Sequence, residues 1–126
     1  MKVGVVSDDD KTVSAHFGMA RHFIVYEIQN GSVVNTEIRQ KASHRHNEVM
    51  HLGVADNPIS EANFHETVLS NVRDCEAIIT RGMGYGMYSS MTQVGIKPFV
   101  TDIPLADKAV QEYIKGTLVN HLERLH

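Results

Sequence analysis

The apolar positions of the first forty residues cluster and alternate in the way that β-strands require. Residues 2–7 (KVGVVS) form a short valine-rich run that ends in polar residues, which is typical of a buried strand. Two β-branched and aromatic runs follow at 22–28 and 32–40, with Asn30-Gly31 between them. Because Asn-Gly favours a tight two-residue turn, these runs predict an antiparallel hairpin.

Residues 41–60 break this rhythm. They show neither the helical nor the strand period, and they include Gly53 and Asn57-Pro58. A connection of about 20 residues is long for a compact domain, and such loops are commonly functional or mobile. We therefore expect a mobile loop over 41–60.

The second half of the chain alternates helical periods with short apolar runs. After Ser60, a residue type that caps helices, a first helix is predicted by apolar residues at helical spacing: Phe64, Val68, Leu69 and Val72. A buried strand follows at 75–80 (CEAIIT). Another helix is predicted to end at Gly95 and to present one apolar face: Met87, Tyr88, Met91 and Val94.

The last elements are a strand and a third helix. The strand at 96–100 contains Pro98, which favours an edge position because proline cannot donate to a ladder. The third helix is predicted to begin near Pro104, to end at Gly116 and to bury four residues: Ala106, Ala109, Val110 and Tyr113. Beyond it, roughly helical spacing continues through Leu118, Leu122 and Leu125.

The element order β-β-β-α-β-α-β-α predicts an α/β fold in one domain, residues 1–126. The first three strands form a meander, whereas a helix joins the last two, which should therefore be parallel. We predict a five-stranded mixed sheet in the order 3-2-1-4-5, with helices on both faces and the second strand antiparallel to its neighbours. This arrangement resembles the ribonuclease-H-like architecture.

That strand order places two loops beside one another. The chain leaves the first and fourth strands in opposite directions, and ligands of open α/β sheets favour the crevice at the carboxyl ends of such a pair. The loops in question are residues 7–18 and 81–86. We therefore expect the functional site between them.

The second of these loops is rich in glycine. Gly82, Gly84 and Gly86 would let the backbone approach a ligand closely before a helix begins, and a helix N-terminus favours an anion. Arg81 adds a cation. The spacing G-x-G-x-G matches neither the dinucleotide fingerprint nor the phosphate loop. A tight turn that needs small residues for packing explains these glycines equally well.

The first loop carries His16-Phe17-Gly18. A lone histidine beside a phenylalanine is more often structural than a ligand. Here, however, the predicted topology makes His16 face the glycine loop across the crevice, which favours a binding role.

Composition narrows the classes of function. The formal net charge is −3, which disfavours a binder of duplex nucleic acid. Cys75 is the only cysteine, so an internal disulfide or a cysteine-rich metal cage within one chain is excluded. We expect Cys75 to be an inert, buried thiol. No apolar stretch approaches the roughly 20 residues of a membrane span, and the N-terminus lacks a signal-peptide pattern, so we expect a cytoplasmic protein.

An enzymatic alternative rests on the acidic run at Asp8, Asp9 and Asp10. A ribonuclease-H-like nuclease holds two metal ions with several carboxylates. The first strand contains no acid, however, and the fourth ends in Arg81-Gly82 where another acid would be needed. We interpret the run as a solvated turn.

A histidine-rich stretch forms a second candidate metal site. His44 and His46 make an H-x-H pair that His51 could join, and imidazoles suit zinc, nickel or copper. Arg45 places a cation between the pair, and no partner is evident to orient the rings. We favour a solvated flap here, and we interpret His22, His65, His121 and His126 as structural or surface residues.

Three segments together resemble the dinitrogenase iron–molybdenum cofactor biosynthesis family: SAHFGMARHFIVYEIQNG, CEAIITRGMGYGMYSSMTQVGIKPFV and ADKAVQEYIKGTL. The resemblance covers almost the whole chain except 41–60. The pairing of an H-F-G loop with a G-M-G-x-G turn, in this order, is fairly specific. It implies a ribonuclease-H-like fold.

The resemblance also implies a non-catalytic carrier of an anionic iron–sulfur-type or iron–molybdenum-type cluster or its precursor. His16 matches the histidine of the family motif and is the expected metal ligand, with Phe17 and Gly18 beside it. Gly82, Gly84 and Gly86 match the glycine turn, and Arg81 and Met83 lie within the same motif. The expected partners are the cluster and a donor or acceptor protein. The alternative is a protein-interaction or metal-sensing module of the same fold that holds no cluster.

Overall fold

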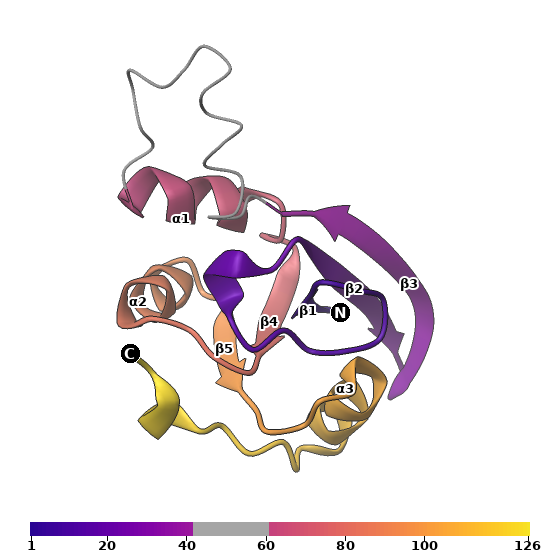
Figure 1. Ribbon diagram of the computed structural model, residues 1–126. Helices are drawn as coiled ribbons and strands as arrows, with labels where there is room; N and C mark the ends of the chain where they lie inside the picture. Colours follow the sequence, from indigo (N-terminus) through magenta and orange to yellow (C-terminus); the bar gives the residue numbers. More distant parts are fainter. Residues whose placement is uncertain (42–60) are drawn as a thin grey trace.

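The computed structural model describes residues 1–41 and 61–126. A twisted five-stranded sheet forms the centre of the protein (Figure 1). Its strand order is β3-β2-β1-β4-β5, as predicted. β2 is antiparallel to β1 and β3, whereas β4 is parallel to both β1 and β5. The strands are β1 (Lys2–Ser7), β2 (His22–Gln29), β3 (Ser32–Gln40), β4 (Cys75–Thr80) and β5 (Lys97–Val100).

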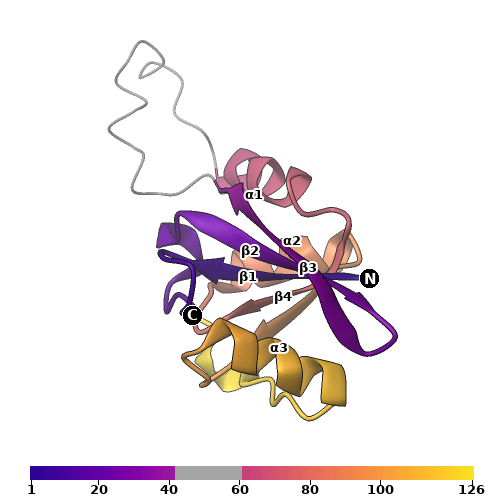
Figure 2. The ribbon, with the colours of Figure 1, turned by 90° about the vertical axis from the view of Figure 1, so that its right-hand side faces the viewer.

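Helices cover both faces of this sheet, which confirms the predicted fold class (Figures 1 and 2). α1 (Glu61–Ser70) and α2 (Tyr85–Gln93) pack on one face, and α3 (Ala106–Lys115) packs on the other. The 3₁₀ turns η1 (Phe17–Met19) and η3 (Leu122–Arg124) lie outside these helices. Within the described ranges, no helix combines the length and apolarity that a membrane span requires.

Apolar residues on both sides of β1 and β4 divide the core into two layers. Val6 and Ile78 face α1 and α2, whereas Val3 and Ile79 face α3, and all four are fully buried. A strand that is buried on both faces has a continuous apolar run instead of an alternating one. For this reason the runs KVGVV and AII indicate central strands.

Two turns form at the residues that the sequence indicates. Asn30 and Gly31 both have positive φ angles, 54° and 79°, as a tight hairpin turn between β2 and β3 requires. Gly116 has φ 75° in the left-handed region and ends α3 after Lys115.

In the segment after Gly116, the roughly helical spacing of the leucines corresponds only to the short 3₁₀ turn η3. Asn120 instead bonds to the edge strand β5: its Oδ1 accepts from the Val100 amide at 2.9 Å, and its Nδ2 donates to the Pro98 carbonyl at 2.9 Å. With the His121 amide, which donates to the Val100 carbonyl at 2.7 Å, these side-chain bonds hold the segment against β5. Leu118 and Leu125 pack against different core layers.

Two smaller predictions were also wrong. Val94 lies beyond the last residue of α2 and is 41% exposed, because the chain already turns there toward Gly95. Lys41, assigned to the mobile loop, is 2% exposed, and its amide donates to the Arg21 carbonyl at 3.1 Å. The rest of that loop, with His44, His46 and His51, lies outside the described residues.

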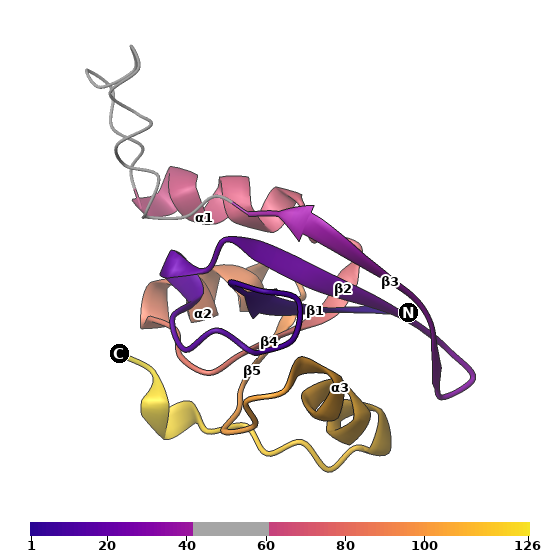
Figure 3. The same cartoon turned by 45° about the vertical axis from the view of Figure 1, so that its right-hand side comes forward.

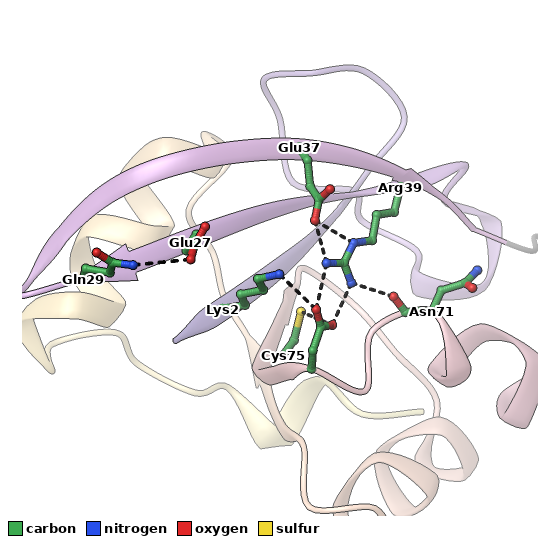
Figure 4. Close-up of polar contacts among 8 residues, drawn as sticks. Lys2, Glu27, Gln29, Glu37, Arg39, Asn71 and Cys75 are labelled. Carbon is green, nitrogen blue, oxygen red and sulfur yellow. Dashed lines mark hydrogen bonds and ion pairs between the residues drawn. The ribbon is translucent and has the colours of Figure 1, made fainter.

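An ion-pair network connects the edge strand β3 to the end of α1 (Figure 4). Arg39 forms a two-pronged pair with Asp74, with distances of 2.7 Å and 2.9 Å, and it also contacts Glu37 at 2.6 Å. Lys2 reaches Asp74 at 3.3 Å. These cations hold the pKa of the Asp74 carboxyl well below its usual range. The network thus connects β3 to the turn between α1 and β4.

Candidate functional site

The two loops predicted to meet are hydrogen-bonded to one another. The Arg81 amide donates to the Ser14 carbonyl, and the Phe17 amide donates to the Gly82 carbonyl, each at 3.0 Å. The packing is so close that a Cβ atom on Gly82 would lie 2.3 Å from the carbonyl oxygen of Ala15. At Gly82, therefore, close packing between the loops accounts for the glycine.

A cavity of about 460 Å³ opens beside this junction. This volume falls within the range of small-molecule sites. The walls come from the first loop, α1, the turn before α2, the first turn of α2 and the chain's last residue. The lining residues are His16, Phe17, Gly18, Met19, Phe64, His65, Met83, Gly84, Tyr85, Gly86, Met87 and His126.

His16 stands at the start of η1, where its backbone is extended (φ −136°, ψ 105°). Its amide donates to Ser14 Oγ at 3.2 Å, and its carbonyl accepts from the Met19 and Ala20 amides, both at 3.1 Å. These bonds fix the backbone of an exposed residue whose ring borders the cavity. Phe17 next to it is buried and packs edge-to-face on Phe23.

His65, which the sequence indicated only as a structural or surface residue, also lines the cavity. It belongs to α1, and its Nδ1 lies 3.0 Å from Ser90 Oγ on α2. A Cβ atom on Gly86 would approach His65 Cε1 to 3.0 Å. No local motif marks His65, because its proximity to the glycine turn arises only when α1 packs against α2.

His126 reaches the cavity because the end of the chain folds back over the turn before α2 (Figure 3). Its amide donates to the Met83 carbonyl at 3.3 Å, and its carbonyl oxygen accepts from the Tyr85 amide at 2.9 Å. The second bond satisfies one of the amides that a helix N-terminus leaves without an internal partner.

Of the remaining predicted site residues, Gly84 and Gly86 lie on the cavity wall, and Met83 lies there with its side chain almost fully buried. Arg81 and Gly82 are not among the lining residues. Arg81 is half-buried, and its Nε is buried with no hydrogen-bond partner among residues 1–41 and 61–126. The guanidinium therefore stands beside the site rather than in its wall.

Lys41 adds a buried amine behind the aromatic wall. Its Nζ lies 4.8 Å from the ring centre of Phe17 and 5.8 Å from that of Phe64, and it donates to the Ala20 carbonyl at 3.1 Å. Burial lowers the pKa of Lys41 to about 7, against a smaller opposing effect from the Asp8 carboxylate. Sequence reasoning missed Lys41 because it was grouped with the following polar loop.

The chemistry of the wall favours an anion. Among residues 1–41 and 64–126, the lining includes three imidazoles, aromatic rings and thioethers but no Asp or Glu side chain. The first turn of α2 adds backbone amides and the positive end of the helix dipole. In the part of the chain that the structure describes, no three His, Cys, Asp or Glu side chains are grouped to hold a metal ion. This donor set suits a polyatomic guest better than a single ion.

Residues 1–116 match the sequence model of the family described as dinitrogenase iron–molybdenum cofactor. This chain belongs to that family. It is 28% identical over 118 residues to an uncharacterised protein of Methanocaldococcus jannaschii, which covers 94% of this chain and 89% of that protein.

Solved structures share the family's fold. A proposed dinitrogenase from Methanocaldococcus jannaschii superposes with a TM-score of 0.64 at 21% identity, covering 97% of this chain and 95% of that one. The apo form of the orange protein from Desulfovibrio gigas gives a TM-score of 0.66 at 16% identity, covering 96% and 92%. At these identities the likeness concerns the fold alone.

In this member of the family, the acidic run forms a turn. Asp9 Oδ1 accepts from the amides of Lys11 and Thr12 at 2.8 Å and 2.7 Å, and Oδ2 accepts from Thr12 Oγ1 at 2.8 Å. These bonds hold the pKa of Asp9 far below its usual range. The solvated turn expected from the sequence is what the structure contains.

Cys75 of this family member is 3% exposed at the start of β4. Burial, with the neighbouring Asp74 carboxylate, raises the pKa of its thiol to about 12. The expected burial of Cys75 is confirmed, and the direction of its pKa agrees with the prediction of an inert thiol, because the thiolate is the reactive form.

Proposed function

We propose that this chain is a non-catalytic carrier of an anionic iron–sulfur-type or iron–molybdenum-type cluster, or of a precursor of one. The cargo occupies the cavity between the first loop, α1 and the N-terminus of α2, and a donor or acceptor protein exchanges it. The observation that carries this proposal is the cavity wall itself, which combines imidazoles with a helix N-terminus and, among its described lining residues, has no Asp or Glu side chain.

The roles of individual residues follow from their positions. His16 supplies an imidazole nitrogen to a metal of the cargo, because its backbone is fixed while its ring borders the cavity. Gly84 and Gly86 let the cargo approach the backbone of the α2 N-terminus. Phe17 and Met83 supply apolar wall, which excludes water. Arg81 acts through its charge, at longer range.

A carrier has to release its cargo, which bears on the number of protein ligands. A four-thiolate cage would hold a cluster tightly, whereas this chain has one buried cysteine and a few imidazoles at the cavity. Few protein–metal bonds, supplemented by backbone amides, suit exchange between proteins. Membership of the dinitrogenase iron–molybdenum cofactor family supports a cargo of this class.

Anaerobic reconstitution tests the proposal. The purified chain is incubated with ferrous iron and sulfide, desalted, and analysed for bound iron, acid-labile sulfide and visible absorption. We expect iron and sulfide to remain bound in near-stoichiometric amounts. Failure to retain either, with the fold intact by circular dichroism, would favour a protein-interaction or sensory module that holds no cluster.

A further inference from the structure

The two edges of the sheet differ in how their outward peptide groups are bonded. At the β5 edge, Pro98 has no amide hydrogen, and the Asn120 side chain bonds to the Pro98 carbonyl and the Val100 amide. The Val100 carbonyl accepts from the His121 amide at 2.7 Å. Proline and covering segments are devices that keep an edge strand from pairing with another chain. The β5 edge is thus closed.

The hydrogen bonds of β2 show which peptide groups of β3 point away from the sheet. The Ile28 amide donates to the Met1 carbonyl at 2.7 Å, and the Ile28 carbonyl accepts from the Met1 amino group at 2.9 Å. Because peptide groups alternate in direction along a strand, the odd-numbered residues of β2 bond to β3. From residue 35 to residue 39, their partners are the odd-numbered residues of β3. The even-numbered ones, Thr36, Ile38 and Gln40, therefore point outward.

These outward groups lie on a long and exposed edge. β3 is nine residues long, contains no proline and forms the outer edge of the sheet (Figure 1). Val34 and Ile38 are each 53% exposed. In the part of the chain that the structure describes, one side chain bonds to these outward groups: Asn71 donates to the Gln40 carbonyl at 3.3 Å. A carbonyl can accept a second hydrogen bond, so the edge remains a template for pairing.

The regular part of β3 restricts how a second copy can pair with it. The register against β2 shifts between Glu27 and Ile28, so the ladder is regular only from residue 35 to residue 40. When two identical strands pair antiparallel about a two-fold axis, outward residues must lie opposite outward residues. A pairing of five residues within this segment then has two possible axes, one through Glu37 and one through Ile38.

Charge selects between these axes. An axis through Glu37 would place the two Glu37 carboxylates opposite one another, which is destabilising. An axis through Ile38 places Glu37 opposite Arg39 of the second copy, and Arg39 opposite Glu37. Because Arg39 already contacts Glu37 of its own chain at 2.6 Å, the four charges alternate in sign around the axis. On the other face the two Ile38 side chains meet, flanked by Thr36 and Gln40.

We propose that the β3 edge is a self-association surface, at which two copies of this chain pair antiparallel about an axis at Ile38. The pairing joins the two sheets into one. Five residues from each strand make a small contact, so the dimer is weak and reversible. None of the described cavity-lining residues belongs to β3, so both cavities stay open. The inference is therefore independent of any cargo.

Sedimentation equilibrium of the unmodified chain, from about 10 μM to about 1 mM, measures the association. We expect the average mass to rise with concentration from 14.1 kDa toward twice that value. Ile38→Lys places two cations at the axis and should weaken association at least about tenfold. Thr36→Pro removes one outward amide and should also weaken it. Val119→Lys changes another exposed aliphatic residue, 62% exposed and outside β3, and should have no effect.

An exchange of charges tests the register. Glu37→Lys alone and Arg39→Glu alone each place like charges opposite one another, so each variant should associate at least about tenfold more weakly. In an equimolar mixture, both contacts become complementary and association should return. Thermal melts verify folding, because Arg39→Glu also breaks the pair with Asp74. In the unmodified chain, an isotope-filtered NOE between the Hα atoms of Glu37 and Arg39 of different copies reports the same register.

The possible results separate clearly. A chain that stays monomeric at the highest concentration would overturn the proposal, and an extended segment of a different protein would then be the occupant of the edge. A dimer that Ile38→Lys and Thr36→Pro leave intact would also overturn it, because another surface would then hold the copies together. Association without the NOE between Glu37 and Arg39 would show that the register is wrong.

Discussion

Lys41 Nζ lies 4.8 Å from the centre of the Phe17 ring, so a buried amine stands directly behind a wall of the candidate site. Burial lowers the pKa of Lys41 to about 7 from its ordinary value of 10.5. The folded state thus disfavours the charged amine, so the free energy of unfolding should depend on pH.

Between pH 7 and 10.5, the unfolded chain binds a proton at Lys41 that the folded chain releases. The contribution of Lys41 to the free energy of unfolding therefore rises with pH across this window, with a slope approaching about 1.4 kcal/mol per pH unit. Lys41→Met should remove this slope and stabilise the protein at pH 7 by on the order of 2 kcal/mol, allowing for the lost bond to Ala20. Urea denaturation at several pH values measures it. Lys11→Met, at an exposed position, is the control, and an equal slope in both variants would contradict the assignment.

Gly82→Ala should destabilise the fold by about 2–3 kcal/mol, because the new Cβ would force the two loops apart. The clash is with a backbone atom, the Ala15 carbonyl oxygen at 2.3 Å, which cannot rotate away. Gly84→Ala is the matched control, since its Cβ would lie 3.4 Å from the nearest atom. Thermal unfolding should show a small change for Gly84→Ala, and comparable losses in the two variants would refute the loop-packing explanation.

Asn120→Ala should loosen the end of the chain. The variant leaves the Val100 amide and the Pro98 carbonyl without their partner, at a cost of about 1–3 kcal/mol. Because the same segment delivers the His126 carbonyl to the Tyr85 amide, hydrogen exchange at Tyr85 should accelerate. Asn71→Ala is the control, because Asn71 lies in the turn after α1 and its side chain donates to the Gln40 carbonyl. Unchanged protection of Tyr85 would show that this amide is held independently of Asn120.

Arg81→Ala should weaken cluster retention by less than His16→Ala does, because Arg81 is not part of the cavity wall. The effect should shrink as the salt concentration rises, since screening suppresses an interaction that acts at a distance. Retention is compared at 50 mM and 500 mM sodium chloride, with Arg124→Ala as the control for net charge. A loss that is independent of salt would indicate direct contact between the guanidinium and the cargo.

The sequence predicted the sheet well because its central strands are unbroken apolar runs and its turns use Asn30-Gly31 and Gly116, whose left-handed backbone few other residues adopt. It was less informative after Gly116, where the leucine spacing corresponds only to the 3₁₀ turn η3 and the Asn120 side chain bonds to the edge strand β5. Pairing across an edge depends on where the chain lies in space, and no local period encodes that.

The same distinction applies to the site. His16 and the glycine turn were found from motifs on two loops that the strand order brings together. His65, His126 and Lys41 carry no motif, and they reach the cavity through helix packing, chain reversal and burial behind Phe17. Residues assembled only by tertiary contacts are those that local sequence patterns do not reveal.

The central claim is that His16 binds a metal of an anionic cluster in this cavity. The most direct measurement is the visible absorption of the reconstituted protein, compared between the unmodified chain, His16→Ala and His22→Ala, with thermal melts to verify folding. His22 is the matched control, because its ring contacts the Asp9 carbonyl and is not among the cavity-lining residues. We expect that His22→Ala retains the cluster bands and that His16→Ala, although folded, loses most of them. If His16→Ala shows normal bands while the double variant His44→Ala/His46→Ala loses them, the assignment of His16 as the metal ligand is wrong.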